Sequence, residues 1–494
     1  MNLRRTNLFL SLMLAMFLAA VEGTIVTMAT PTIAKDLQGF ELISLVFSVY
    51  LLTSAISTPI YGKFADLYGR KNVLSIGILI FLAGSFLCGL SQSMATLIAF
   101  RAIQGLGAGS ILTVSLTIVG DAFTVEERPK VQGSLTTVWG IASLVGPFLG
   151  GFLIDILSWH WIFFINIPFG LLSVILLQRS FKETFEEKKH NIDYTGTITL
   201  SLAVIVFLSI FLLDQNSDYN RNIFTGIAAV ITVLLLFAFY KIERKAKEPM
   251  MPFDIFTKTN IIVYMISFLV YAVLMGVSVY MPIYLQNIQG YRPTAAGLAM
   301  LPMSLSWIIV SFVLGKLLVK YGGKAVTLTS NAILIVSTLL LSTLGIDSPI
   351  LLVLAYIFII GIGFGGAGTA LIIIVQDSVE YNKRGAAVAA NTLLRTLGQT
   401  IGISVFGSIF NLYIMKYFMQ QGIKGINLSN LYQSSASHTA LSAEQIKLSL
   451  NSSMHVLFII FIIISCLSLV LSIVMPGMKE KRRTKQIKAF NPTE

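Results

Sequence analysis

The sequence predicts an all-α polytopic membrane protein with two six-helix lobes and an inserted helix pair, about 14 transmembrane helices in total. The first observation is composition: of 494 residues, 55% are hydrophobic and only 12% are charged, whereas soluble domains carry about 25% charged residues. The second is a series of apolar runs, each of about 20 residues and long enough to span roughly 30 Å of hydrocarbon. The third is an internal repeat that divides most of the chain into two corresponding halves.

The apolar runs recur along the whole chain. In chain order, the predicted spans are 7–30, 43–61, 73–91, 95–119, 132–156, 160–179, 194–213, 223–240, 260–284, 295–315, 325–345, 349–375, 386–411 and 454–475. The first run follows a basic segment that ends at Arg5, as in a signal peptide, but it continues past Ala20. Because the apolar region of a signal peptide has only about 7–15 residues, we expect a retained helix.

The positive charges set the predicted orientation. Most of the 35 Lys and Arg residues lie on the side of the membrane that holds the N-terminus, with an excess of roughly fourfold over the opposite side. We therefore expect a multi-pass protein of the cytoplasmic (plasma) membrane with both termini in the cytoplasm. This bias explains the net charge of +12, so the expected partner is the lipid bilayer and not nucleic acid.

The two halves of the chain share short motifs at a nearly constant offset. The segment 62–71 resembles the segment 315–324, which lies 253 residues later. The glycine-rich segment 105–109 corresponds to 361–365 at an offset of 256. At that second offset, the further matches are Asp121 with Asp377, Arg128 with Arg384, and Gly146 with Gly402. Such repeats are typical of two-lobed transporters that rock about a central site.

The offset defines the predicted organisation. Six spans precede residue 180 and the second lobe starts near residue 260, so the two spans between them are an insertion. The predicted parts are an N-terminal lobe at 1–181, two extra helices with cytoplasmic connectors at 182–259, a C-terminal lobe at 260–475 and a basic cytoplasmic tail at 476–494. The C-terminal lobe includes an outer loop at 412–453, in which the capping-box pattern of 442–445 predicts a short surface helix.

Several segments resemble motifs of a known family. The segment 62–71 (GKFADLYGRK) is similar to the cytoplasmic loop signature of the major facilitator superfamily, and 101–107 (RAIQGLG) is similar to its span-four motif. The segment 140–151, which ends in GPFLGG, resembles the span-five motif of antiporters. The segment 22–31 (EGTIVTMATP) resembles the span-one motif of the 14-span drug:proton antiporters, with Glu22 where Asp is usual.

Two further segments, 159–168 and 280–286, are similar to the same branch, so the resemblance covers nearly the whole chain. It implies a proton-coupled antiporter that exports lipophilic or cationic drugs and toxic compounds by alternating access, and hence a role in antibiotic resistance. We expect small-molecule substrates and protons as partners, no cofactor, the proton gradient as energy source and function as a monomer. The composition is compatible with a bacterial source.

Motifs of other protein classes are missing from the sequence. It contains no phosphate-binding loop for ATP, no nucleophile elbow, no zinc-binding helix and no His cluster. We therefore expect neither an enzyme nor a metal site, and we interpret Cys88 and Cys466 as ordinary residues of apolar runs. Two alternatives stay open on the same scaffold: an exporter of one endogenous solute, such as a lipid, sugar or metabolite, and a transport-inactive sensor.

Two charged residues lie deep within predicted spans of the first lobe, away from the span ends. Glu22 is about 15 residues into its span, or roughly 22 Å at 1.5 Å per residue. Because intramembrane acids are costly and usually functional, Glu22 is the predicted proton-coupling residue; the alternative is a permanently protonated carboxyl bonded to a neighbour such as Thr24. The resemblance implies that Arg101 communicates with this site. Its physical partners would be Gln104, a backbone carbonyl or Glu22 itself.

The loop between the second and third spans is the predicted cytoplasmic gate. Gly62 and Gly69 permit a tight turn, and Asp66 can act as an anion at a helix N-terminus of the second lobe near residue 385. Arg70 could pair with Asp121 at the inner end of the fourth span. The alternative is solvated surface charge that contributes about 0–1 kcal/mol.

Small residues in the fifth span form the predicted hinge. These residues are Gly140, Gly146, Pro147, Gly150 and Gly151. Their spacing lets helices approach closely, and proline adds a kink. The functional interpretation is a hinge and a seal against proton leak, and ordinary tight packing is the alternative.

Aromatic and polar residues within spans are candidates for the substrate cavity. Trp139 and Trp307 could contact a flat or cationic drug by stacking or cation–π attraction, although most such residues belong to the core or face lipid. Arg395 is the second cation inside a span. It either serves the cavity together with Asn391, or makes a structural bond to Asn391 or to a backbone carbonyl.

Overall fold

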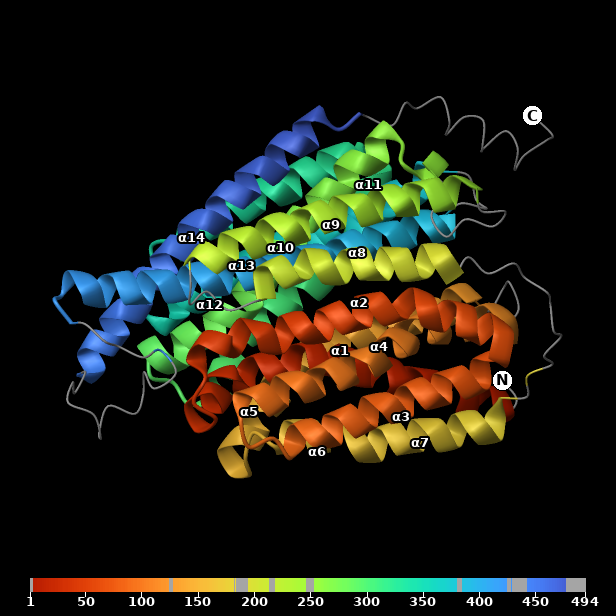
Figure 1. Cartoon of the computed structure of the whole chain (residues 1–494), viewed down its shortest axis with the longest axis horizontal. Helices are drawn as coiled ribbons and strands as arrows, with labels where there is room; N and C mark the ends of the chain where they lie inside the picture. The colour runs from red at the N-terminus through yellow and green to blue at the C-terminus, as the bar shows by residue number, and fades with distance from the viewer. Residues whose placement is uncertain are drawn as a thin grey trace.

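The structure, a computed structural model, describes residues 3–123, 128–181, 183, 194–212, 218–245, 253–379, 384–423, 428 and 442–476. All regular elements of this part are helical, and thirteen helical segments are long and apolar enough to cross a membrane. A shorter apolar segment, Ile198–Phe207, lies within a further helix. The helices run side by side through the molecule in Figure 1 and agree with the predicted total of about 14 spans.

The N-terminal lobe contains the first seven α-helices. They are α1 (Leu3–Asp36), α2 (Ile43–Tyr68), α3 (Arg70–Gly89), α4 (Met94–Ala122), α5 (Arg128–Ile156), α6 (Trp161–Phe164) and α7 (Asn166–Ser180), with the short helix η1 (Phe40–Leu42) before α2. The sixth predicted span is divided, because α6 ends at Phe164 and α7 starts at Asn166.

The inserted pair and the C-terminal lobe follow. The pair is α8 (Tyr194–Leu212) and α9 (Asp218–Lys245). The lobe contains η2 (Phe253–Ile255), α10 (Lys258–Ile283), η3 (Tyr284–Ile288), α11 (Pro293–Leu341), α12 (Ile350–Asp377), α13 (Arg384–Gln420) and α14 (Ala443–Val474). α11 holds two spans, because a kink at Gly322 divides it. The lobe therefore has six spans, as predicted.

Two glycines mark the same turn in the two lobes. Gly69 separates α2 from α3 with φ 86° and ψ 139°, and Gly322 divides α11 with φ 81° and ψ 160°. The two positions are 253 residues apart, which is the offset of the sequence repeat. Because a positive φ strains residues that have a side chain, both turns require glycine. The repeat is thus present in the backbone as well as in the sequence.

The inserted pair packs across the boundary between the lobes. α8 contacts α2 of the first lobe, α13 of the second lobe and its own partner α9. Val204 of α8 packs in one apolar cluster with Leu52 of α2 and Leu397 of α13. In Figure 1, α8 lies between α2 and the helices of the second lobe. α9 exposes many large apolar side chains, such as Val233 and Leu234, as expected for a helix that faces lipid.

Helices occupy both ends of the predicted outer loop at 412–453. α13 continues to Gln420 and α14 begins at Ala443. The predicted capping box is present, because Ser442 and Gln445 exchange two hydrogen bonds of 2.9 and 3.1 Å. The prediction of a separate surface helix is wrong, since this box starts the final span itself. Extending an existing helix costs less than nucleating a new one.

With the predicted orientation, the described contacts between the lobes lie in the outer halves of the spans. α5 contacts α11, α2 contacts α13 and α1 contacts α10. Ser304 donates a hydrogen bond of 2.6 Å to the carbonyl of Ser143, and the hydroxyls of Ser48 and Ser404 lie 2.7 Å apart. Within the described part, inter-lobe hydrogen bonds gather at this end. With the predicted orientation, the conformation is closed on the outer side.

Candidate functional site

Glu22 and Arg101 form an ion pair inside the N-terminal lobe. Glu22 lies on α1 and Arg101 on α4, and their side chains are 0% and 1% exposed. The Glu22 Oε1 atom accepts a hydrogen bond from Arg101 Nη1, and the Oε2 atom accepts one of 2.8 Å from Asn166 Nδ2 on α7. Three helices therefore meet at one carboxylate, and each of its oxygens has a donor.

Arg101 has further partners beyond the carboxylate. Its Nη1 atom donates to Gln104 Oε1 at 2.7 Å, and its Nε atom donates to the carbonyl of Val46 at 3.2 Å. The guanidinium also lies 4.1 Å from the centre of the Tyr50 ring, a distance suited to cation–π attraction. All three kinds of partner predicted for Arg101 are confirmed, and they occur together.

A second group of side chains holds the cluster in position. Asn166 Nδ2 also donates to the Ser85 hydroxyl at 3.0 Å, and that hydroxyl donates to the carbonyl of Phe163 at 2.8 Å. Thr24, the expected neighbour of a protonated Glu22, instead donates to the carbonyls of Val21 and Ala142. The expected bond between Thr24 and Glu22 is therefore wrong, because Thr24 lies two residues on and faces α5.

Sequence reasoning missed three members of this cluster: Tyr50, Ser85 and Asn166. Asn166 gave a usable signal, because it is an amide within an apolar run. Gln104 was predicted as a partner of Arg101 because it lies three residues later, on the same face of α4. Tyr50 and Ser85 gave none, since hydroxyls occur throughout these spans and nothing in their spacing connects them with Glu22.

The cluster can respond to a proton. Breaking one side of a buried ion pair is strongly unfavourable, by about 3–5 kcal/mol, so protonation of Glu22 would have to be balanced by the remaining partners of Arg101. One donor is free to take part in such a response, because the Gln104 Nε2 atom is buried without a hydrogen-bond partner in the described part. The arrangement thus links the protonation of one carboxyl to the positions of α1, α4 and α7.

The predicted gate falls partly outside the described part. The side chains of Asp66 and Asp121 are not among the described ones, so their predicted contacts stay predictions. At the start of α3, the backbone N–H groups of Arg70 and Lys71 donate to the carboxylate of Glu183, at 2.7 and 3.1 Å. An acid of the connector after α7, absent from the prediction, therefore occupies a helix N-terminus at the gate.

One ion pair of the second lobe joins the residues that match Asp121 and Arg128 in the sequence repeat. Asp377 at the end of α12 and Arg384 at the start of α13 form an ion pair of 3.9 Å. They correspond to Asp121 and Arg128 of the first lobe at the repeat offset. Gly62 makes only ordinary contact, since a Cβ atom there would lie 3.5 Å from the Thr113 methyl group.

The small residues of α5 form two packing faces. A Cβ atom on Gly146 would collide with Thr24, and one on Gly150 would lie 2.9 Å from the carbonyl oxygen of Ile25. This first face therefore packs against α1 one turn beyond Glu22. A Cβ atom on Gly151 would collide with the backbone of Pro293 on α11.

The second face of α5 continues toward the inner side. A Cβ atom on Gly297 of α11 would collide with the carbonyl of Pro147. Gly140, farther inward, has only ordinary contact with Ile308, whose nearest atom would be 3.4 Å away. α5 thus connects the turn that carries Glu22 with the contact between the lobes.

The predicted cavity residues differ in exposure and in the rings that they contact. Trp139 is 41% exposed, while Trp307 is half-buried and has its ring 6.4 Å from that of Phe364. The Arg395 guanidinium lies 3.9 Å from the centre of the Tyr271 ring. The structural bond proposed between Arg395 and Asn391 is not formed in the described part, because each side chain lacks a hydrogen bond there.

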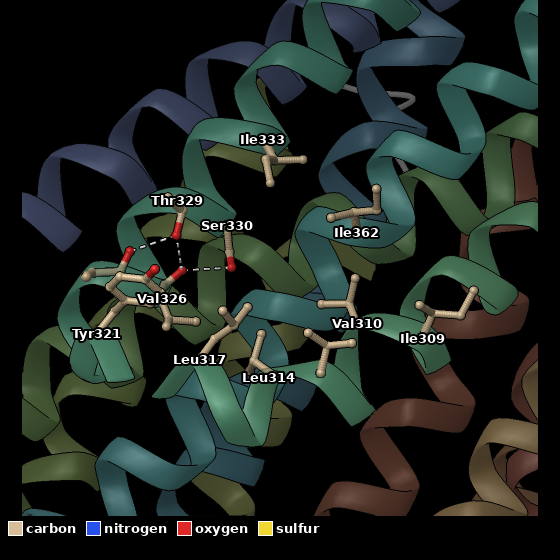
Figure 2. Close-up of a pocket in the computed structure, with 12 residues that line it drawn as sticks. Ile309, Val310, Leu314, Leu317, Tyr321, Val326, Thr329, Ser330, Ile333 and Ile362 are labelled. Carbon is tan, nitrogen blue, oxygen red and sulfur yellow. Dashed lines mark hydrogen bonds between the residues drawn. The ribbon is translucent and has the colours of Figure 1, made fainter. Parts of the chain in front are cut away.

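A groove of about 480 Å³ lies between the two arms of α11 and α12. Figure 2 shows apolar side chains around it, among them Leu314, Leu317 and Ile362. Among the side chains in its wall, the hydroxyls of Thr329 and Ser330 donate to backbone carbonyls of their own helix. The groove therefore offers apolar contact, and its lining side chains carry no charge.

The chain matches the family model described as Major Facilitator Superfamily over residues 12–403. It is 34% identical over 410 residues to the multidrug transporter protein MdtP of Bacillus subtilis (strain 168), covering 83% of this chain and 76% of that protein. It is also 34% identical over 434 residues to the multidrug efflux pump SdrM of Staphylococcus aureus (strain N315), covering 87% of this chain and 94% of that protein.

Two solved structures share the fold. One is a bacterial homologue of the human lysosomal transporter Spinster in an inward-facing and occupied conformation, with a TM-score of 0.67, 15% identity and coverage of 96% of this chain and 97% of that chain. The other is the nucleoside transporter NupG, with a TM-score of 0.64, 14% identity and coverage of 96% of this chain and 99% of that chain. At such identities the likeness concerns the fold alone.

Proposed function

This chain belongs to the major facilitator superfamily, and from that premise we propose that it is a proton-coupled antiporter that exports lipophilic or cationic drugs and toxic compounds. It acts across the cytoplasmic membrane of a bacterium by alternating access, with both termini in the cytoplasm. Two bacterial relatives that are 34% identical are named for multidrug transport or efflux, and they support the substrate class. The family consists of transporters and not of enzymes.

The observation that carries the proton coupling is the buried cluster around Glu22. A carboxylate without exposed surface lies beside a guanidinium that has two further acceptors, Gln104 Oε1 and the Val46 carbonyl. When Glu22 takes up a proton, Arg101 keeps these acceptors and the face of the Tyr50 ring. The cost of separating the pair is thereby reduced, which lets the carboxyl exchange a proton during the cycle.

Coupling to the lobes follows from the packing of α5. Thr24 and Ile25 of α1 lie one turn from Glu22 and touch Gly146 and Gly150 of α5. The opposite face of α5 touches α11 across the lobe boundary. A shift of α1 on protonation is therefore passed directly to the contact that closes the outer side. A side chain at either glycine position would prevent this close packing.

The proposal is tested with purified protein in liposomes under an imposed pH gradient, with a pH-sensitive dye inside and a panel of lipophilic cations outside. Glu22→Gln provides an amide oxygen as an acceptor for Arg101, but the amide does not exchange a proton in the physiological pH range. We expect substrate-dependent proton flux to fall at least about tenfold in this variant. Glu22→Asp keeps the acid and should retain coupling at a lower rate.

The matched control is Glu444→Gln, which removes another acid, in the first turn of α14 and distant in sequence from the cluster. It should transport like the unmodified protein. Coupled flux that survives in Glu22→Gln would remove Glu22 from the mechanism. No flux with any compound, from a folded protein, would favour an exporter of one endogenous solute.

A further inference from the structure

The C-terminal lobe holds a positive charge in a setting quite unlike that of Arg101. Arg395 lies on α13, eleven residues from its first residue, or roughly 16 Å along the helix axis. Its guanidinium stacks on the Tyr271 ring of α10 at 3.9 Å. Asn391 lies one helical turn away on the same face of α13, and its side chain is 1% exposed.

These three side chains have unused hydrogen-bonding capacity. In the described part of the chain, neither the Arg395 guanidinium, nor the Tyr271 hydroxyl, nor the Asn391 amide makes a hydrogen bond, and the guanidinium has no carboxylate partner. The Asn391 Oδ1 atom is fully buried without a partner. Arg101, also within a span, has a carboxylate and two further acceptors. A cation at membrane depth without such compensation is costly, and it indicates a missing anion.

The position of Arg395 on α13 separates it from the inserted helices. Leu397 and Ile401 pack against α8, while Ser404 bonds Ser48 of α2. Arg395 points to a different side of α13, toward α10, which itself contacts the first lobe. Its charge is therefore placed between helices that take part in the lobe boundary and away from the α8 side.

Aromatic side chains border this position. A Cβ atom on Gly368 of α12 would lie 2.9 Å from the Tyr271 hydroxyl oxygen and 3.7 Å from Cζ2 of Trp307. The absence of a side chain at Gly368 therefore lets the Tyr271 hydroxyl lie against α12, close to the Trp307 ring. Four helices contribute to one small region: Tyr271 from α10, Trp307 from α11, Gly368 from α12 and Arg395 from α13.

We propose that Arg395, Tyr271 and Asn391 bind the carboxylate of an aromatic amphiphilic substrate, so that the exported compounds include carboxylates as well as cations. The guanidinium supplies paired N–H donors in the fork geometry that suits a carboxylate. The Tyr271 hydroxyl and the Asn391 amide supply additional donors, and the substrate's aromatic part lies beside Trp307. This inference rests on the proposed export function and extends its substrate class.

The test uses two dyes that differ in one group: rhodamine B, which has a free carboxylate, and its ethyl ester, which has none. Equilibrium binding to the purified protein in detergent is measured by fluorescence polarisation, without a proton gradient. The unmodified protein should bind rhodamine B at least about tenfold more tightly than the ester. Arg395→Gln should abolish this preference while its affinity for the ester stays the same.

Three variants separate the site from general damage. Arg395→Lys keeps the charge but loses the fork, so it should keep part of the preference. Tyr271→Phe removes one donor and should reduce the preference a few-fold. Lys416→Gln removes another cation of α13, stacked on Tyr413 at 5.3 Å, and should change nothing.

The outcomes for this site and for export are distinguishable. Equal binding of the two dyes by the unmodified protein, no binding of either dye, or a preference that survives Arg395→Gln would overturn the carboxylate site. A preference that depends on Arg395, in a protein that shows no proton-driven transport of either dye in liposomes, would support the site and contradict the proposed export.

Discussion

Glu22 and Arg395 carry opposite charges within the spans, and their surroundings differ in kind. The Glu22 carboxylate is saturated, because Arg101 and Asn166 each donate to one of its oxygens. Arg395 has an aromatic neighbour and no acceptor in the described part. The Glu22 site can hold or release a proton through its own partners, whereas the acceptor that we propose for Arg395 is the carboxylate of a substrate. The two lobes therefore provide different chemistry.

The buried ion pair of Glu22 and Arg101 predicts a non-additive effect on stability. Arg101→Gln leaves the carboxylate buried without its charged partner and should lower the free energy of unfolding by about 3–5 kcal/mol. The double variant Glu22→Gln, Arg101→Gln removes both charges, so most of that loss should be recovered. Thermal unfolding in detergent gives the comparison. A double variant no more stable than Arg101→Gln would show that the amide network around Asn166, and not the charge pair, determines stability.

The sequence predicted the charged pair but not its full environment. Glu22 and Arg101 stand out because charges are rare in apolar runs, and the three possible partners of Arg101 follow from its reach along and across helices. The contributions of Tyr50 and Ser85 could not be predicted, because they depend on the rotation of α2 and α3 about their own axes. That rotation is set by packing between helices that are far apart in the sequence.

The sequence repeat predicted two equivalent turns between helices, one in each lobe. The glycines at these turns share a backbone conformation and differ in the atoms that surround them. Gly69 and Gly322 share a positive φ. A Cβ atom on Gly322 would have no atom within 4 Å, whereas one on Gly69 would lie 2.9 Å from Glu183 Oε2. Glu183, which accepts hydrogen bonds at the start of α3, is therefore a feature of the turn at Gly69, and the turn at Gly322 has no atom in the corresponding place.

This difference predicts unequal effects of one substitution. Gly322→Ala should cost about 1–2 kcal/mol of unfolding free energy, because only the backbone strain of positive φ applies. Gly69→Ala should cost more, because the methyl group also disturbs the carboxylate that accepts from Arg70 and Lys71. Thermal unfolding in detergent measures both losses.

Gly345→Ala is the control for this pair, since position 345 has neither a positive φ nor a near neighbour. It should be close to neutral. Equal losses at positions 69 and 322 would show that Glu183 does not contribute to holding the turn.

The limits of the helices were harder to predict than their number. The spans predicted at 386–411 and 454–475 are α13 and α14, which begin or end up to eleven residues away from those limits. The continuation of α13 from Leu412 to Gln420 is mostly apolar (LYIMKYFMQ). The prediction ended this span too early because about 20–25 apolar residues already suffice to cross the hydrocarbon. The capping box at Ser442 was visible in the sequence, but its helix could not be identified as the final span without the structure.

For the whole molecule, the conformation is determined by how closely α5 and α11 can approach at the outer end. Gly151 packs against the backbone of Pro293, and Gly297 packs against the backbone of Pro147. In both contacts a glycine lies against a backbone carbonyl of the other lobe. Thr294 adds two hydrogen bonds to Asp155, one of them from its backbone N–H at 3.0 Å. Since these contacts join the two lobes, they stabilise the state closed on the outer side and must separate when that side opens.

Enlarging Gly297 should therefore shift the population of the two states. In Gly297→Val the side chain cannot fit beside the Pro147 carbonyl, so the closed state loses free energy while an open state does not. Nitroxide labels at Leu157 and Asp347, one in each lobe at the outer end, report the separation by double electron–electron resonance after Cys466 is replaced by Ser. We expect the longer label-to-label distance of the open state to become more populated than the shorter distance of the closed state. Transport should slow, because the cycle needs both the open and the closed state.

The control for this shift is Gly226→Val on α9, where an added side chain would meet no atom within 4 Å of its Cβ position. α9 packs on α8 and takes no part in the α5–α11 contact, so this variant should keep the distances of the unmodified protein. If Gly297→Val also left them unchanged, the outer closure would have to be held elsewhere, and the pair formed by α2 and α13 through Ser48 and Ser404 would be the next contact to separate. If instead only Gly297→Val opened the outer end, the glycine positions of α5 and α11 would set the equilibrium on which alternating access depends.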